Sequence, residues 1–118
     1  MSGNYKVDVS FGNNNSKTWQ NLMALTGDGA VKGLFYESGT VDVASLADGV
    51  GATSTLTVNG VALGDIVLGV SMGVDAAGMT VTGYVSAANI VSVRFQNESG
   101  GGVNLASTTM RVLVADLT

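Results

Sequence analysis

Short runs of Val, Thr, Ile and Leu, separated by clusters of Gly, Asn and Asp, recur along most of this sequence. Runs of this length with such boundaries are typical of β-strands joined by tight turns. The chain has no proline and 17 glycines, so its turns depend on residues that tolerate a positive φ. Its 118 residues suffice for one domain and not for two. The sequence therefore predicts a small domain built from short strands.

Within these runs, apolar residues alternate with polar ones, as they do in a strand with one buried face. The apolar members are Val41 and Val43; Leu56 and Val58; Met79, Val81 and Val85; Val91, Val93 and Phe95; and Met110, Val112 and Val114. Residues 65–72 are apolar on both faces apart from Asp65, Gly69 and Ser71, which predicts a central strand. Six or more such strands predict an all-β fold, an antiparallel β-sandwich of two sheets.

The Asn59-Gly60 pair has two interpretations. It fits a two-residue hairpin turn, because apolar residues flank it on both sides. It also fits a plain turn that precedes a second turn at Gly64-Asp65. The alternation does not resume cleanly after the pair, which favours the plain turn.

The first 38 residues follow a different pattern. They predict an N-terminal arm or docking segment over residues 1–38, followed by a β-sandwich core over residues 39–118. Residues 17–25 are compatible with a short helix that Ser16 caps, or with an extended arm.

Three aromatic residues of this segment, Tyr5, Phe11 and Trp19, are candidate interface residues. Large aromatic side chains dominate the contacts that hold protein complexes together, so an arm that carries them suits docking onto a neighbour. The alternative is that these side chains close one end of the sandwich, in which case the segment belongs to it.

Charged residues make up only 12% of the chain, about half the usual share of ~25%, while 46% of the residues are hydrophobic. Either part of the surface is covered by copies of the chain or by a partner, or the surface is neutral and rich in Ser, Thr and Asn. The net charge is −4, and the five basic residues form no patch that would neutralise phosphates. We therefore expect neither nucleic acid nor an anionic membrane as a partner.

The chain has no histidine and no cysteine, so it lacks the commonest general base, the usual zinc ligands and the best nucleophile. Gly69–Gly73 matches the G-x-S-x-G motif around a nucleophilic serine, but that motif needs a strand-to-helix turn and a histidine base. We expect no enzymatic activity and no cofactor. Four aspartates lie in predicted turns, where they either bind calcium or accept hydrogen bonds from turn amides; these are Asp28, Asp48, Asp65 and Asp75.

From Gly39 onward the order of several short blocks is distinctive. The blocks are Leu56–Val58, Gly60–Leu68, Gly83–Val93, Phe95–Gly100, Val103–Ala106 and Met110–Val112. This order resembles a module of small virion structural proteins of tailed bacteriophages. The resemblance implies a jelly-roll-like β-sandwich that acts as a capsid decoration (cement) protein: a homotrimer on the outer capsid surface of the virion, which stabilises the shell by binding across capsomers of the major capsid protein. The matched positions are turn and core residues, and none carries a family-defined functional role.

Two other functions remain open at this point. Related modules occur in other phage appendages, such as the base of a head fibre or a tail tip. A carbohydrate-binding β-sandwich is the second alternative, and it would need an exposed aromatic strip drawn from the few candidates available; these include Tyr5, Trp19, Tyr36 and Tyr84.

Overall fold

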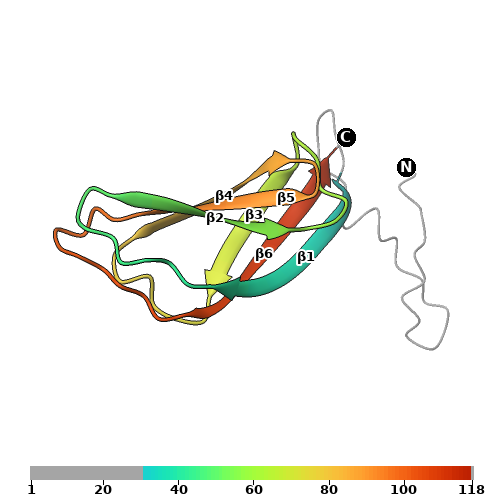
Figure 1. The fold of residues 1–118 in the computed structure, drawn as a ribbon. Coiled ribbons are helices and arrows are strands. Elements are labelled where there is room, and N and C mark those ends of the chain that lie inside the picture. The colour runs from blue at the N-terminus through green and yellow to red at the C-terminus, as the bar shows by residue number, and fades with distance from the viewer. Residues whose placement is uncertain (1–30, 118) are drawn as a thin grey trace. The chain divides into compact units, whose positions relative to one another are not determined.

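The structure is a computed structural model that describes residues 31–117. Within that range the chain forms six strands and no helix (Figure 1). The strands are β1 (Val31–Val41), β2 (Gly51–Thr57), β3 (Ile66–Met72), β4 (Thr80–Ala87), β5 (Ile90–Gln96) and β6 (Thr108–Leu117). Residues Leu34–Asp116 form one compact unit, which is the part of the molecule described below.

The strands form two antiparallel three-stranded sheets, in the orders β1-β6-β3 and β2-β5-β4 (Figure 1). The first strand lies beside the last and the second beside the fifth, so the chain is wound as a nested ribbon in which only β4 and β5 form a hairpin. This is the winding of a jelly roll, with six strands in place of the usual eight. The predicted all-β sandwich is confirmed.

The core lies between the two central strands, β5 and β6. Their inward residues are almost completely buried: Val91, Val93 and Phe95 on β5, and Met110, Val112 and Val114 on β6. These are the residues for which the sequence predicted a buried face. Met79 and Val85, predicted for the inner face of β4, are buried as well.

The two sheets approach each other closely where β4 packs against β3. A Cβ added to Gly83 would lie 2.8 Å from Cγ2 of Val70 and 3.0 Å from Cγ1 of Val67. A contact of 2.8 Å is shorter than real Cβ atoms make, so a larger residue here would force Val70 or the strands to move. Gly83 thus sets the spacing between the sheets at this point.

Two consecutive turns connect β2 to β3, and an asparagine from the β4–β5 turn holds them in place. Val61 N donates to Val58 O, and Gly60 has a φ of 104°. Because β2 and β3 belong to different sheets, Asn59-Gly60 is a plain turn, as its sequence favoured. Asn89 accepts from Gly60 N through Oδ1 at 2.8 Å, and its backbone bonds to Val58 and Val61.

At the other end of the sandwich, the fully buried Asn97 joins the loop before β2 to the loop before β6. Its Nδ2 donates to Leu46 O and to Gly101 O, both at 2.8 Å. Its Oδ1 accepts from the backbone N of Ser99 at 3.0 Å and from Ser99 Oγ at 2.7 Å. Every hydrogen-bonding position of this amide is therefore used inside the protein.

Two predictions about the strands were wrong. The strand expected around Val41 and Val43 ends at Val41, although Val43 remains buried in the following loop. The sequence did not predict β1, which crosses the expected boundary between residues 38 and 39. Residues 34–38 are therefore part of the sandwich.

The third correction concerns residues 65–72. They form β3, but β3 is an edge strand of its sheet rather than a central one. Its outward side chains Ile66 and Leu68 are about half exposed, at 48% and 56%. The apolar character of both faces of β3 thus reflects an apolar outer surface, and not burial on both sides.

Candidate functional site

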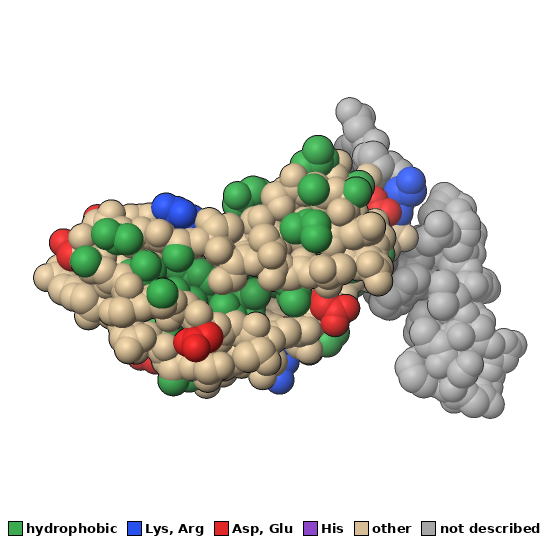
Figure 2. Space-filling model, in the orientation of Figure 1, with side chains coloured by type: hydrophobic (Ala, Val, Ile, Leu, Met, Phe, Trp, Pro, Cys, Tyr) green, Lys and Arg blue, Asp and Glu red, His purple; other side chains and the backbone are tan. Residues whose placement is uncertain are grey.

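The outer surface of the β1-β6-β3 sheet is the most hydrophobic exposed region of the described chain. Eight large hydrophobic side chains are exposed in residues 31–117, and five of them lie on this sheet. We call these five the apolar face: Leu34, Tyr36, Ile66, Leu68 and Leu113. Figure 2, which displays one side of the molecule, shows few charged side chains among many hydrophobic and neutral ones.

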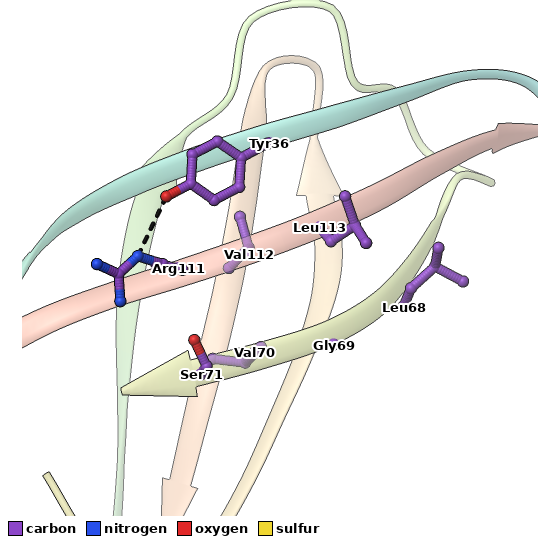
Figure 3. A pocket seen from close by; sticks show the side chains of 8 residues that line it. All are labelled: Tyr36, Leu68, Gly69, Val70, Ser71, Arg111, Val112 and Leu113. Carbon is purple, nitrogen blue, oxygen red and sulfur yellow. Dashed lines mark hydrogen bonds between the residues drawn. The ribbon is translucent and has the colours of Figure 1, made fainter. Parts of the chain in front are cut away.

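A β-bulge brings two leucines of this face together. The pairing of β3 with β6 runs from Val67 opposite Val114 to Gly69 opposite Leu113, which leaves Leu68 as an extra residue. A bulge bends its strand and redirects a side chain. Here Leu68 lies near Leu113 at one end of the apolar face (Figure 3).

An open groove of about 370 Å³ crosses this face. It is lined by Tyr36 from β1, residues 68–71 from β3 and residues 111–113 from β6 (Figure 3). Gly69 leaves space in it, because a Cβ added there would meet no atom within 4 Å. Its volume lies at the lower end of the range of small-molecule pockets, which is about 300–1,000 Å³.

Arg111 supplies the charge at the other end of the groove. Its Nε donates to the hydroxyl of Tyr36 at 3.1 Å, and Ser71 lies opposite it in the pairing of β3 with β6. Within the described residues this is the only hydrogen bond of the guanidinium, and no carboxylate pairs with it. The groove therefore has a polar end at Arg111 and an apolar end at Leu68 and Leu113 (Figure 3).

The outer surface of the β2-β5-β4 sheet is different in character. Its exposed outward positions are mostly hydroxyl residues, and we call them the hydroxyl face: Thr53, Thr55, Thr57, Thr80, Thr82 and Ser86. Arg94 lies among them and donates to Thr53 Oγ1 at 3.3 Å and to Gln96 Oε1 at 3.2 Å. Gln96 in turn donates to Glu98 at 2.8 Å, so the polar groups of this face bind one another.

The candidate interface residues Tyr5, Phe11 and Trp19 lie outside the described residues, as do Asp28 and the predicted helix at 17–25. Tyr36 and Tyr84 lie on strands of different sheets, so these two do not form one aromatic strip.

The serine of the G-x-S-x-G match lies on a strand and not at a strand-to-helix turn. Ser71 is the penultimate residue of β3, its side chain faces the groove, and residues 73–79 lead into β4 without a helix. The local geometry therefore differs from that of a nucleophile elbow.

Each predicted turn aspartate in the described part of the chain accepts a hydrogen bond from a backbone amide. Asp48 accepts from Gly100 at 3.0 Å, Asp65 from Ala62 at 2.9 Å and Asp75 from Ala77 at 3.0 Å. No three His, Cys, Asp or Glu side chains of residues 31–117 lie close enough together to hold a metal ion. The hydrogen bonds of Asp65 and Asp75 stabilise local turns, whereas that of Asp48 joins the loop before β2 to the loop before β6.

The fold and the two faces define this unit as a small antiparallel β-sandwich with one apolar outer sheet. Comparison of the chain with protein-family models, with curated proteins and with solved structures gave no match. Among the described residues, no helix has the length and hydrophobicity needed to cross a membrane.

Sequence reasoning did not find the apolar face or the groove. The signal was present in residues 65–72, whose apolar residues occupy both faces of the strand. A strand that is apolar on both faces is typical of a buried, central position, and large exposed apolar surfaces are uncommon. The contributions of Tyr36 and Arg111 depend on β1 lying beside β6, which no local pattern predicts.

Proposed function

We propose that this chain is a non-enzymatic assembly protein that binds another protein surface through its apolar face. The observation that carries this proposal is the contiguity of that face: neighbouring strands of one sheet present Leu34, Tyr36, Ile66, Leu68 and Leu113 outward. Single exposed hydrophobic residues are common on protein surfaces, whereas adjacent ones mark interaction sites.

The energetics suit a protein that acts in many copies. Removing the exposed half of a leucine or tyrosine side chain from water contributes about 1 kcal/mol. A face of five such side chains gives modest binding per copy, and a repeated shell sums these contributions. Binding energy alone is then sufficient for the function, and no reactive group is required.

The type of assembly that we propose is the shell of a tailed bacteriophage. The chain would be a capsid decoration protein that binds across capsomers of the major capsid protein on the outer surface of the virion, as a homotrimer. The blocks between Leu56 and Val112 and the jelly-roll winding support this proposal. A head-fibre base or tail-tip module is the alternative within the same class.

The test is co-sedimentation of the chain with expanded capsid shells of the phage that encodes it, together with sedimentation velocity of the free chain. We expect saturable binding at threefold or quasi-threefold positions of the lattice and a trimer in solution. The double variant Leu68→Gln/Leu113→Gln should lose most of the binding. Its matched control, Thr55→Gln/Thr82→Gln on the hydroxyl face, should bind like the unmodified chain.

A strict monomer that binds no capsid would contradict the proposal. Electron cryomicroscopy of the virion separates the two members of the class. Density for the chain on the icosahedral lattice supports a decoration protein, and density away from the lattice supports an appendage.

A further inference from the structure

We propose that the groove beside Arg111 is the anchor point for the partner and binds an apolar side chain that lies next to a carboxylate. This inference rests on the proposed function and specifies the chemistry of the partner segment. Three features of the described residues support it: a guanidinium at one end of the groove, leucine side chains at the other end, and no carboxylate among the outward residues of the apolar face.

The polar end is built to receive an anion. The hydrogen bond from Nε of Arg111 to Tyr36 leaves both terminal nitrogens of the guanidinium without a partner among the described residues. Those two nitrogens form a planar pair of donors, which matches the two oxygens of a carboxylate. Ser71, opposite Arg111 on β3, adds a hydroxyl at the same end.

The apolar end has room for a side chain. Leu68 and Leu113 line it, and their exposed fractions are 56% and 39%. Gly69 leaves the space between the two ends open, since a Cβ there would touch nothing within 4 Å. An aliphatic side chain of the partner therefore covers the leucines while its neighbouring carboxylate reaches Arg111.

A second copy that uses the same face does not satisfy Arg111. The outward residues of this face, apart from Arg111, are uncharged on all three strands between Leu34 and Asp116: residues 34, 36, 38 and 40 of β1, 66, 68, 69 and 71 of β3, and 109 and 113 of β6. Glu37 of β1 is exposed, but its position belongs to the inward register of that strand. A symmetric pairing of two such faces would bring arginines together without a carboxylate, and like charges repel. The occupant that fits both ends of the groove is an acidic, apolar segment of a different protein, and self-association is the competing outcome that the test below distinguishes.

A phosphate ligand fits the groove less well than a carboxylate does. Nucleic-acid sites use several basic residues to neutralise successive phosphates. The groove has a single arginine, and the whole chain carries a net charge of −4. One planar cation next to leucines is instead suited to one carboxylate on an apolar segment.

The test uses a minimal probe that carries both features, N-acetyl-L-leucinate, titrated into the full ¹⁵N-labelled chain and followed by NMR. The matched probe is N-acetyl-L-leucinamide, which keeps the side chain and lacks the carboxylate. We expect saturable shifts at the amides of Gly69, Ser71 and Leu113 and at Nε–H of Arg111. The amide probe should bind about two- to fivefold more weakly, which is the effect of one exposed charge pair.

Two variants locate the binding. Gly69→Val fills the groove from a position with free space, and we expect it to weaken both probes about tenfold or more, because a filled site cannot hold the leucine side chain. The control is Gly101→Val, where an added Cβ also meets nothing within 4 Å, and it should leave both affinities unchanged. Arg111→Gln should bind the two probes equally.

Shifts that are absent, or that map to the hydroxyl face, would overturn the assignment of the groove, as would equal binding of the two probes to the unmodified chain. Loss of self-association in Gly69→Val would assign the groove to a second copy and would also overturn it.

The capsid assay keeps this inference separate from the proposed function. If the unmodified chain and Gly69→Val bind capsids equally well, the assembly function stands and the groove is not its anchor. If leucinate binds in the groove and the chain binds no capsid, the groove assignment stands and the assembly function fails.

Discussion

The two outer faces of this sandwich rest on one core and have opposite chemistry. The apolar face presents leucine, isoleucine and tyrosine, whereas the hydroxyl face presents threonine and serine. Their arginines show the same contrast: Arg94 donates to Thr53 and Gln96, while Arg111 donates only to Tyr36 among the described residues. The polar groups of the hydroxyl face therefore bind one another. On the apolar face, the terminal nitrogens of Arg111 have no hydrogen-bond partner among the described residues, and the hydrophobic side chains are exposed.

This contrast explains the scarcity of charge in the sequence. Two causes were open, a neutral hydroxyl-rich surface or a surface that a partner covers. The β2-β5-β4 sheet fits the first cause and the β1-β6-β3 sheet fits the second. The whole-chain figure of 12% charged residues does not reveal this difference in chemistry between the two faces of the described unit.

Both faces belong to one folded unit, and a substitution of the buried Asn97 tests whether the two sheets unfold together. We expect Asn97→Leu to lower the free energy of unfolding by about 3 kcal/mol, because it leaves buried partners such as Leu46 O and Gly101 O without a donor. The measurement is urea denaturation followed by far-UV circular dichroism.

The control for that prediction is Asn104→Leu at an exposed position, which should change stability by less than about 0.5 kcal/mol. Hydrogen exchange in Asn97→Leu should show both sheets opening together. Loss of protection in only one sheet would mean that the two faces rest on separately stable layers.

Two glycine-to-valine variants compare the packing on the inner and outer sides of β3. Gly83 of β4 faces the inner side, and Gly69 of β3 itself faces the outer side. Gly83→Val should lower stability by about 1–3 kcal/mol, because its side chain would have to enter the space of Val67 and Val70 between the sheets. Gly69→Val, on the outer side, should leave stability within about 0.5 kcal/mol. Thermal melts compare the two variants; equal losses would show that the groove is as tightly packed as the core.

Replacing leucines tests whether the apolar face is a surface or part of the core. Leu68→Gln/Leu113→Gln should lower stability by at most about 1 kcal/mol, since both side chains are substantially exposed. The same variant should elute earlier from a hydrophobic-interaction column. Thr55→Gln/Thr82→Gln should elute with the unmodified chain. A large loss of stability with unchanged retention would place the leucines in the core.

The smallest expected difference concerns the two arginines. Arg94→Gln should lower stability by about 0.5–1 kcal/mol, because it removes hydrogen bonds to Thr53 and Gln96 at the surface. Arg111→Gln should change it by less than about 0.5 kcal/mol. Differential scanning calorimetry resolves this difference as a few degrees in Tm. The reverse order would show that Arg111 supports the fold rather than a partner.

Regular alternation made the inner faces of β4, β5 and β6 predictable, because most of their inward positions carry apolar side chains. Strand β1 was missed because three of its inward positions, Gly33, Glu37 and Gly39, depart from that pattern. Glu37 is exposed, and a Cβ added to Gly39 would lie 2.6 Å from Cδ1 of Leu56, so Leu56 occupies the space beside it. A glycine inside a strand looks like a turn in the local sequence.

The groove was beyond prediction for a different reason. Its residues come from β1, β3 and β6, and their proximity depends on the sheet order and on a one-residue bulge at Leu68. Periodicity assigns a face to each residue within a strand, but it does not determine which strands are neighbours. The sequence indicated that both faces of β3 are apolar, but it did not indicate that one of them is exposed.

The nested winding has a consequence for folding during synthesis of the chain. The sheet that carries the apolar face has β6 at its centre, so neither β1 nor β3 has its sheet neighbour before Thr108–Leu117 have been synthesised. Pairing between strands so far apart in sequence is a slow step of folding. A chain synthesised only as far as β5 therefore cannot form the β1-β6-β3 sheet or the groove, whose lining comes from all three of these strands.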